Sequence, residues 1–248
     1  MREFHDTDEL RGARFTAVDL SGARFRNVDL TGAKVVDAML VNAAFSGLID
    51  GLTINDIEVA PLIVAEMDRL YPERSRLFAR DPAGLRAAWS TLEAMWQATT
   101  DRARALPDDV CRARVDDEWS FLETLRHLVF ATDSWISRVV LGETWPYHPL
   151  ALPPSFVTDL VDVGIDDRAE PTFDEVLAVR ADRQAVVRHL LDGMTNEELA
   201  RRCDQNPAPG YPPETTHIVL DCIHGVFDEE WAHHRYAVRD LDALAPRG

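Results

Sequence analysis

A five-residue period runs through the first 50 residues, and it constrains the fold more than any other feature of the sequence. Large apolar residues occupy every fifth position, and a small or β-branched residue stands two places before most of them. The large residues are Leu10, Phe15, Leu20, Phe25, Leu30, Val35, Leu40 and Phe45. An amphipathic helix needs a period near 3.6 and a half-buried strand a period of 2, so neither explains this pattern. A solenoid does, with each unit forming one side of a square coil and its large residue pointing inward.

The same segment resembles the pentapeptide-repeat family, most clearly in the string LRGARFTAVDLSGARFRNVDLTGAKV at residues 10–35. The resemblance implies a short right-handed quadrilateral β-helix over residues 1–50. With about four units in each turn, the repeats make only two coils, and stacked repeats usually need more neighbours to be stable. We therefore expect this segment to pack against the rest of the chain or against a second subunit.

Residues 51–80 are predicted to be a junction between the repeats and the remainder of the chain. An apolar run from Val59 to Val64 contains Pro61, and proline is favoured in the first turn of a helix. A short helix is therefore expected here. Its apolar content predicts that it docks onto another part of the protein.

Four long helical segments are expected after Asp81, with proline-rich connections between some of them. Their expected positions are roughly residues 81–106, 120–141, 173–191 and 215–244. The connection between the second and third is about thirty residues long, and such a loop usually has a function or covers something. This pattern predicts a four-helix bundle over residues 81–248. The expected fold class is therefore α+β with several domains, a short β-helix followed by the bundle.

The net charge of −17 argues against nucleic-acid binding, which needs a basic surface for the phosphates. It also disfavours binding to anionic membranes. The sequence has no apolar stretch of the roughly 18 residues that would span a membrane, and no hydrophobic signal region. A cytoplasmic protein of bacterial type is expected. The three cysteines lack the spacing of a disulfide framework or a thiolate zinc site.

The last helical segment carries the strongest candidates for a functional site. Winding it at 100° per residue places Glu230 and His234 near the middle of an apolar face, four residues apart. A carboxylate and an imidazole on such a face need partners, and this spacing lets both reach one metal ion. Glu229 and His233 lie at the edge of the same face. They are interpreted as rim residues and are the weaker alternates for the metal site.

A third ligand would have to come from another helix, and His127 in the second segment is the candidate. The apolar face of that segment lies opposite His127. The stripe that contains His127 holds small and polar residues instead, namely Ser120, Glu123, Thr124, Ala131 and Ser134. These residues would either line a wet cleft or face solvent. The helical pattern alone does not decide between these two interpretations.

Two motifs resemble the DinB-like (YfiT-like) superfamily over roughly residues 81–248. They are Asp117-Glu118-Trp119-Ser120 followed by Leu125-Arg126-His127-Leu128, and Glu229-Glu230-Trp231-Ala232-His233-His234-Arg235. The resemblance implies a four-helix bundle that holds a metal with one histidine on the second helix and two histidines four residues apart on the last.

His127 matches the first of these ligand positions and His234 the last, whereas Glu230 stands where the family has a histidine. The predicted metal site is therefore His127, Glu230 and His234. Two histidines and one carboxylate suit zinc, nickel, manganese or ferrous iron. The same departure from the family pattern is also compatible with a site that has lost its metal.

The resemblance implies a divalent-metal-dependent transferase or hydrolase that acts on a small molecule. It also implies a low-molecular-weight thiol of the mycothiol or bacillithiol type as co-reactant, and a homodimer. The sequence identifies neither the thiol nor any catalytic residue. Five aromatic residues of the two proline-rich connections are candidates for the walls of a pocket: Trp145, Tyr147, His148, Phe156 and Tyr211. Packing of these loops against the protein explains the five residues equally well.

The alternative hypothesis is a non-catalytic protein-interaction module with a degenerate metal site. In that case Glu230 and His234 would form a buried pair with each other, as a hydrogen bond or salt bridge. The acidic surface or the β-helix would bind a protein partner. The two hypotheses differ in whether the three side chains converge on one point at metal-ligand distance.

Overall fold

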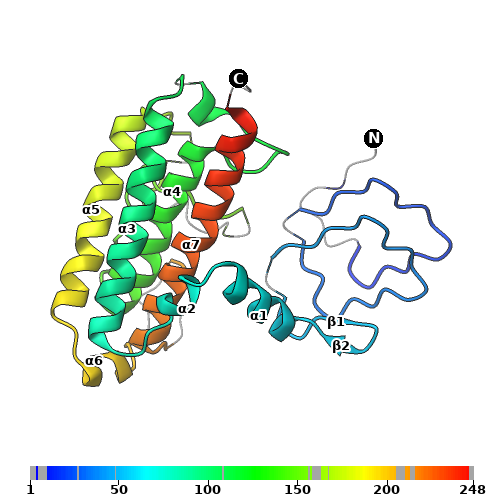
Figure 1. Ribbon diagram of the computed structural model, residues 1–248, viewed down its shortest axis with the longest axis horizontal. Helices are drawn as coiled ribbons and strands as arrows, with labels where there is room; N and C mark the ends of the chain where they lie inside the picture. Colours follow the sequence, from blue (N-terminus) through cyan, green and yellow to red (C-terminus); the bar gives the residue numbers. More distant parts are fainter. Residues whose placement is uncertain are drawn as a thin grey trace. The chain divides into compact units, whose positions relative to one another are not determined.

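The computed structural model describes residues 4, 10–26, 28–47, 49–107, 109–155, 157, 163–166, 168–204, 210–212 and 216–245. The chain divides into two compact units, residues 1–43 and residues 44–248. The first unit contains most of the repeats, and the second is mostly helical (Figure 1). None of the helices in the described ranges has the length and apolar character needed to cross a membrane.

The repeat unit is built from reverse turns spaced ten residues apart. In each turn an alanine N–H donates to the carbonyl of the leucine three residues earlier, over 2.9 Å in the first three turns and 3.4 Å in the fourth. The turns are Leu10–Ala13, Leu20–Ala23, Leu30–Ala33 and Leu40–Ala43. Their third residues have positive φ, 71° at Gly12 and 58° at Asn42, which glycine and asparagine adopt most readily.

The described part of this unit does not show the predicted β-helix. It contains no strand, and the eight large apolar residues of the repeats are 41–69% exposed, where the prediction had them pointing inward. The physical difficulty is the number of units. A stack of two coils gives each coil only one neighbour to pack against, so little apolar surface is buried.

The helical unit begins with a small hairpin and two short helices. Strands β1 (Thr53–Ile54) and β2 (Ile57–Glu58) pair antiparallel across a two-residue turn with positive φ at both positions. Helix α1 (Ala60–Leu70) has Pro61 in its first turn, as predicted, and α2 (Arg74–Leu77) follows. Docking of α1 is limited, because none of its residues is buried and only Met67 packs against the helical core.

Four long helical segments pack side by side in the rest of this unit (Figure 1). They are α3 (Pro82–Arg104), α4 (Phe121–Thr132) continued by the π-helix η2 (Asp133–Val140), α5 (Phe173–Asp192) and α7 (Val219–Leu244). The 3₁₀-helix η1 (Val110–Arg112) and the short helix α6 (Asn196–Ala200) complete the unit. The predicted apolar faces form its core, where the rings of Trp89 and Phe227 stack with centroids 5.4 Å apart.

Side-chain caps explain where three of these helices begin. Asp81 accepts a hydrogen bond from the backbone of Gly84 over 2.9 Å at the start of α3. Ser120 and Thr172 form complete capping boxes at the starts of α4 and α5. Each box satisfies two backbone N–H groups that have no partner inside the helix.

The helix formed by α4 and η2 is enclosed on nearly all sides, and this gives its polar residues unusual surroundings. It packs against α5 and α7, and the long loop after η2 covers the side that holds the polar stripe. The guanidinium of Arg126 fixes that loop by donating to three backbone carbonyls, those of Leu150, Asp166 and Ala169. The small and polar stripe of this helix is therefore buried, except for Glu123, which is half-buried.

Asp133, at the junction of α4 and η2, is fully buried and bridges two other segments. Its carboxylate accepts a hydrogen bond from the backbone N–H of His148 over 2.9 Å and another from Arg183 on α5. Burial raises the pKa of Asp133 to about 6, although the Arg183 guanidinium and the His148 N–H favour the ionised form. The protonated carboxyl is therefore favoured by folding.

We predict that this carboxyl makes the folded state less stable as pH rises from about 4 to about 6. The folded state holds the proton more tightly than the unfolded state, so raising the pH through this window lowers the free energy of unfolding by at most about 3 kcal/mol. Urea denaturation of the wild type and Asp133→Asn at pH 4.5 and pH 7 measures this contribution. The wild type should lose more stability than the variant between the two pH values; equal losses would contradict the assignment.

Glu230 and Arg180 form an ion pair in the interior between α7 and α5. Two parallel hydrogen bonds, of 2.9 and 2.8 Å, join the guanidinium to the carboxylate, and the Glu230 residue is 1% exposed. The guanidinium also lies over the ring of Trp96, 5.9 Å from its centroid. The partner of Glu230 is thus Arg180 and not His234, in contrast to the buried pair expected under the alternative hypothesis.

Removal of one member of this pair should be strongly destabilising. We expect Glu230→Ala to lower the free energy of unfolding by about 3–5 kcal/mol, because Arg180 is left buried without its counter-charge. The double variant Arg180→Leu, Glu230→Leu should recover most of that loss. Urea denaturation tests both, with Glu66→Ala as the matched control, since the Arg69–Glu66 pair is exposed and should contribute little. A Glu230→Ala variant as stable as this control would refute the prediction.

Candidate metal centre

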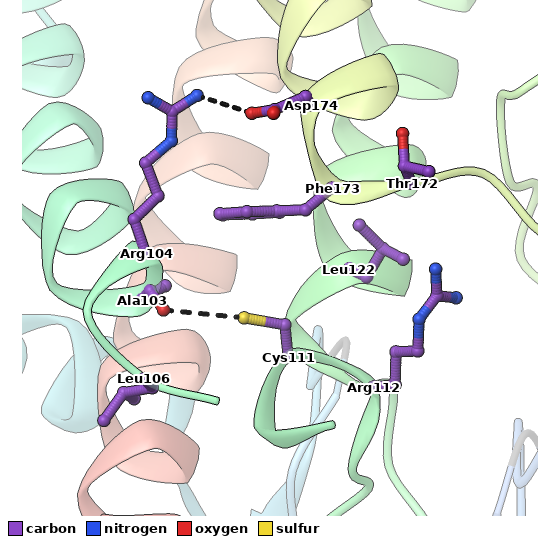
Figure 2. Close-up of a pocket in the computed structure, with 9 residues that line it drawn as sticks. All are labelled: Ala103, Arg104, Leu106, Cys111, Arg112, Leu122, Thr172, Phe173 and Asp174. Carbon is purple, nitrogen blue, oxygen red and sulfur yellow. Dashed lines mark hydrogen bonds and ion pairs between the residues drawn. The ribbon is translucent and has the colours of Figure 1, made fainter. Parts of the chain in front are cut away.

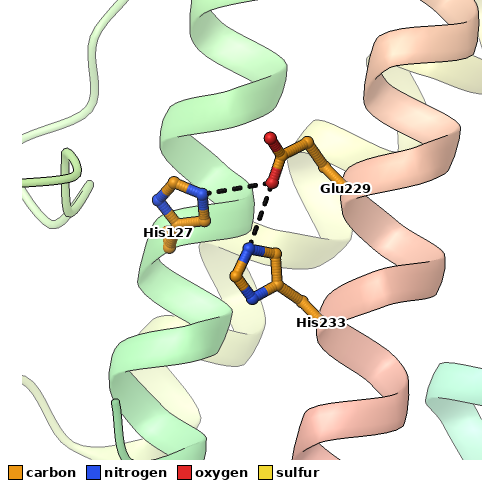
Figure 3. Close-up of side chains that lie close together, drawn as sticks. All are labelled: His127, Glu229 and His233. Atoms are coloured by element: carbon orange, nitrogen blue, oxygen red, sulfur yellow. Dashed lines mark hydrogen bonds and ion pairs between the residues drawn. The ribbon is translucent and has the colours of Figure 1, made fainter. Parts of the chain in front are cut away.

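Three side chains from α4 and α7 converge in the helical unit: His127, Glu229 and His233 (Figure 3). One ligand atom from each lies within 4.8 Å of the others. Glu229 Oε2 is 3.4 Å from His127 Nε2 and 3.1 Å from His233 Nε2, so the carboxylate lies against both rings. Within the described residues this is the cluster of histidine, cysteine and acidic side chains close enough to share an ion.

Helix geometry explains why these three residues meet. Glu229 and His233 are four residues apart on α7, so both side chains leave the same face of the helix. That face is turned toward α4, where His127 lies on the polar stripe. Burial increases from α7 to α4, since the side chains are 39% exposed at Glu229, 18% at His233 and 7% at His127.

A backbone contact fixes the orientation of the His127 ring. Its Nδ1 lies 3.1 Å from the carbonyl oxygen of Leu152 in the long loop. A carbonyl can only accept a hydrogen bond, so Nδ1 carries the proton of the neutral ring. Nε2 then presents its lone pair to the Glu229 carboxylate. This arrangement, a ring held by a backbone carbonyl with its other nitrogen directed at a shared point, is common among metal-binding histidines.

The electrostatics of the cluster favour a neutral His127 beside an ionised Glu229. Burial lowers the pKa of His127, and the nearby carboxylate only partly offsets this effect. Burial works against ionisation of Glu229, but where the imidazole nitrogens that face it carry a proton, their hydrogen bonds and positive charge outweigh burial and lower its pKa well below the usual range. The carboxylate therefore keeps its negative charge, and the two rings supply nitrogen donors.

Aromatic rings surround the cluster. The ring of Trp119 lies against both histidines, and Phe130 contacts His127 with centroids 6.1 Å apart. Tyr211 packs on Phe130 and is close enough to Glu229 for the carboxylate to help raise the pKa of its phenol, although burial is the larger cause.

The aromatic residues proposed as pocket walls differ in burial and in the residues that they contact. Tyr147 is buried and stacks on Phe130, whereas Trp145 is exposed. His148 is half-buried, and its pKa is lowered by burial and by Arg183. Phe156 lies outside the described residues. The long loop thus places Tyr147 beside Phe130 and covers His127 through Leu152, whereas Trp145 is mostly exposed.

Glu230 and His234 lie outside this cluster. Glu230 is paired with Arg180 on α5, and His234 Nε2 lies 2.8 Å from Thr99 Oγ1 and 3.2 Å from the Met95 carbonyl on α3. The structure therefore brings His127 together with the alternates, Glu229 and His233, and not with the pair preferred from the sequence. Metal binding by either set stays a prediction.

The apolar stripe on α7 identifies its buried face but not the neighbour that each buried residue meets. The centre of that face is turned toward α3 and α5, so Glu230 and His234 reach partners there. The edge of the face is turned toward α4 and meets His127. The sequence feature that favours Glu229 and His233 is the polar stripe on α4. Once this stripe is buried, its residues need polar partners on the neighbouring helix.

A pocket of about 440 Å³ lies elsewhere, among α3, η1, α4 and the start of α5 (Figure 2). Its polar groups already have protein partners. Arg104 pairs with Asp174 over 2.9 Å, and the Cys111 thiol donates to the Ala103 carbonyl over 3.8 Å. None of its lining residues belongs to the histidine cluster, so the pocket is separate from the candidate centre.

Comparison with known families agrees with this architecture. A model of pentapeptide repeats matches residues 9–47 in eight copies. A model of the DinB superfamily matches residues 91–237, which includes the whole histidine cluster. No curated protein and no solved structure matches the chain. The second match spans more than half of the 248 residues, and the protein therefore belongs to the DinB superfamily, with pentapeptide repeats preceding the family's domain.

Proposed function

We propose that His127, Glu229 and His233 bind one divalent metal ion, and that the protein is a metal-dependent transferase or hydrolase acting on a small molecule. The observation that carries this proposal is the position of the Glu229 carboxylate, with its Oε2 atom 3.4 and 3.1 Å from two imidazole nitrogens. Membership of the DinB superfamily supports it.

The donor set fits a divalent ion. The His127 proton is used at Nδ1, so a neutral ring has no second N–H to give to Glu229. The His127 Nε2 atom and the Glu229 oxygen, 3.4 Å apart, would then both be electron-pair donors directed at one point. A cation at this point satisfies both donors and accounts for the burial of His127. Two imidazoles and one carboxylate suit zinc, nickel, manganese or ferrous iron.

Each protein residue has a distinct part in this proposal. His127 and His233 offer neutral nitrogen ligands, and Glu229 offers one negative charge, so the occupied site has a net charge of about +1. That charge favours an anionic or strongly polarised group of the substrate or co-reactant at the remaining positions. A bound ion would supply Lewis acidity there. The Leu152 carbonyl keeps the His127 ring in the ligating orientation.

A low-molecular-weight thiol of the mycothiol or bacillithiol type is the co-reactant that we propose. Its thiolate is an anionic, soft ligand that suits a site with net positive charge and two imidazoles. The aromatic surroundings of the cluster, formed by Trp119, Phe130 and Tyr211, favour an apolar or aromatic portion in the second substrate.

A second candidate function is a non-catalytic interaction module. It is favoured by the exposure of the eight large apolar residues of the repeats. A second copy of the chain or a basic protein would then bind through the repeats or the acidic surface. In this case the cluster of His127, Glu229 and His233 would hold no metal.

Metal content of the purified protein tests the first proposal against the second. Protein prepared without chelator, and protein incubated with zinc, nickel, manganese or ferrous iron under anaerobic conditions, should contain about one ion per chain. Glu229→Gln, which keeps the shape of the side chain and removes its charge, should lose the ion. His233→Ala and His127→Ala should also lose it. Elemental analysis after equilibrium dialysis gives the metal content.

Glu230→Gln and His234→Ala are matched controls, because they change the same residue types one position along the same helix. Both should retain the ion when folded, which circular dichroism verifies. Loss of metal in these two variants with retention in Glu229→Gln and His233→Ala would reassign the ligands to Glu230 and His234. A wild-type protein without metal under every condition would reject the site and favour the interaction module.

A further inference from the structure

Among the described residues, Trp119 is the aromatic residue that contacts both histidines of the cluster. Its ring centroid lies 4.4 Å from that of His127, at 37° between planes, and 5.8 Å from that of His233, at 29°. The other rings beside the cluster contact one histidine each, Phe130 next to His127 and Tyr236 next to His233. One flat surface therefore spans ligands from two different helices.

The segment that carries Trp119 is anchored on both helices. Immediately before it, the Glu118 carboxylate pairs with Arg239 on α7. Immediately after it, Ser120 forms the capping box that begins α4. The backbone on both sides of Trp119 is thus attached to the two helices that carry the histidines.

A strained turn directs the chain into this position. Asp116 and Asp117 have φ of 51° and 61°, and the N–H of Glu118 donates to the Val115 carbonyl over 2.9 Å. Two consecutive left-handed residues are the pattern of a type I′ turn, in which glycine or asparagine is usual. Aspartate tolerates this conformation at some cost. Such strain is kept where the surrounding structure requires one backbone path.

We propose that Trp119 is a positioning residue of the metal site. It contacts both imidazole rings and restricts their rotation, so that both Nε2 atoms stay directed at the position shared with Glu229. This inference rests on the proposed function, because it assigns a role only if the cluster binds an ion. Groups that orient metal ligands affect affinity by about 10- to 100-fold in other sites, although they do not touch the metal.

The test compares Trp119→Leu, which keeps an apolar side chain but has no flat ring, with Trp119→Phe, which keeps a flat ring. Co²⁺ is the probe, because its visible absorption reports ligand geometry. Trp119→Leu should bind Co²⁺ about tenfold more weakly than the wild type and give a different absorption spectrum. Trp119→Phe should restore the wild-type spectrum and most of the affinity. Equilibrium dialysis gives the affinities, and circular dichroism verifies folding.

Fluorescence provides a second readout, since bound Co²⁺ quenches nearby indoles. The protein has six tryptophans, so the quenched fraction must be assigned. Quenching should largely disappear in Trp119→Phe but persist in Trp145→Phe, because Trp145 is 59% exposed and belongs to none of the cluster's contacts. Glu118→Ala leaves the ring intact and releases its segment from α7, and it should shift the Co²⁺ spectrum in the same direction as Trp119→Leu.

The outcomes separate this inference from the proposed function. A wild-type protein that binds no Co²⁺ would reject the metal site itself, and the role of Trp119 with it. A wild type that binds Co²⁺, together with a folded Trp119→Leu variant of the same affinity and spectrum, would overturn only the role of Trp119. If Trp119→Leu does not fold, an unchanged spectrum in Glu118→Ala together with unchanged quenching in Trp119→Phe would overturn it instead.

Discussion

The structure of the helical unit depends on one constraint: the helix formed by α4 and η2 is enclosed, although it carries polar and charged side chains on several faces. Each of these groups needs an internal partner, because a buried polar group without one is costly. Arg126 binds three loop carbonyls, and Asp133 binds Arg183 and the His148 backbone. His127 has Leu152 on one side of its ring and Glu229 on the other. The candidate centre and the attachment of the long loop thus have the same cause, because both give internal partners to buried polar groups of this helix.

The helices of this unit could be predicted from the sequence, because their signals are local. Caps such as Asp81, the apolar stripes and the proline in α1 are properties of short segments, and they placed the elements within a few residues. The π-helix of η2 and the small hairpin at β1 and β2 were not predicted, since their hydrogen bonding leaves no clear periodic pattern. The repeat pattern was matched by a family model, but its coils depend on stacking between distant units, which a local pattern does not determine.

The candidate site shows a different limit. The periodicity of α7 predicts that Glu230 and His234 face the interior of the helical unit, and both do. Their partners, however, lie on α5 and α3, and not on α4. Which neighbouring helix a buried residue meets depends on how the helices are arranged around α7, and the spacing of apolar residues does not encode that arrangement. The weaker alternates, Glu229 and His233, meet His127 because their edge of α7 is turned toward α4. Burial alone therefore does not identify which residues of α7 contact His127.

Two Glu-His pairs stand side by side on α7, and the structure gives them different surroundings. A shift of one residue rotates a side chain by about 100° around the helix, so the two pairs cannot exchange places without turning α7. Glu230 meets a guanidinium, which already supplies a full positive charge and two hydrogen bonds. Glu229 meets only imidazoles, and it stays partly open to solvent. Either Glu-His pair, together with His127, would offer two imidazoles and one carboxylate. The set of ligand types inferred from the sequence is therefore the same for both pairs. Among the described residues, the two pairs therefore differ in the partner of the carboxylate, which is a guanidinium at Glu230 and two imidazoles at Glu229.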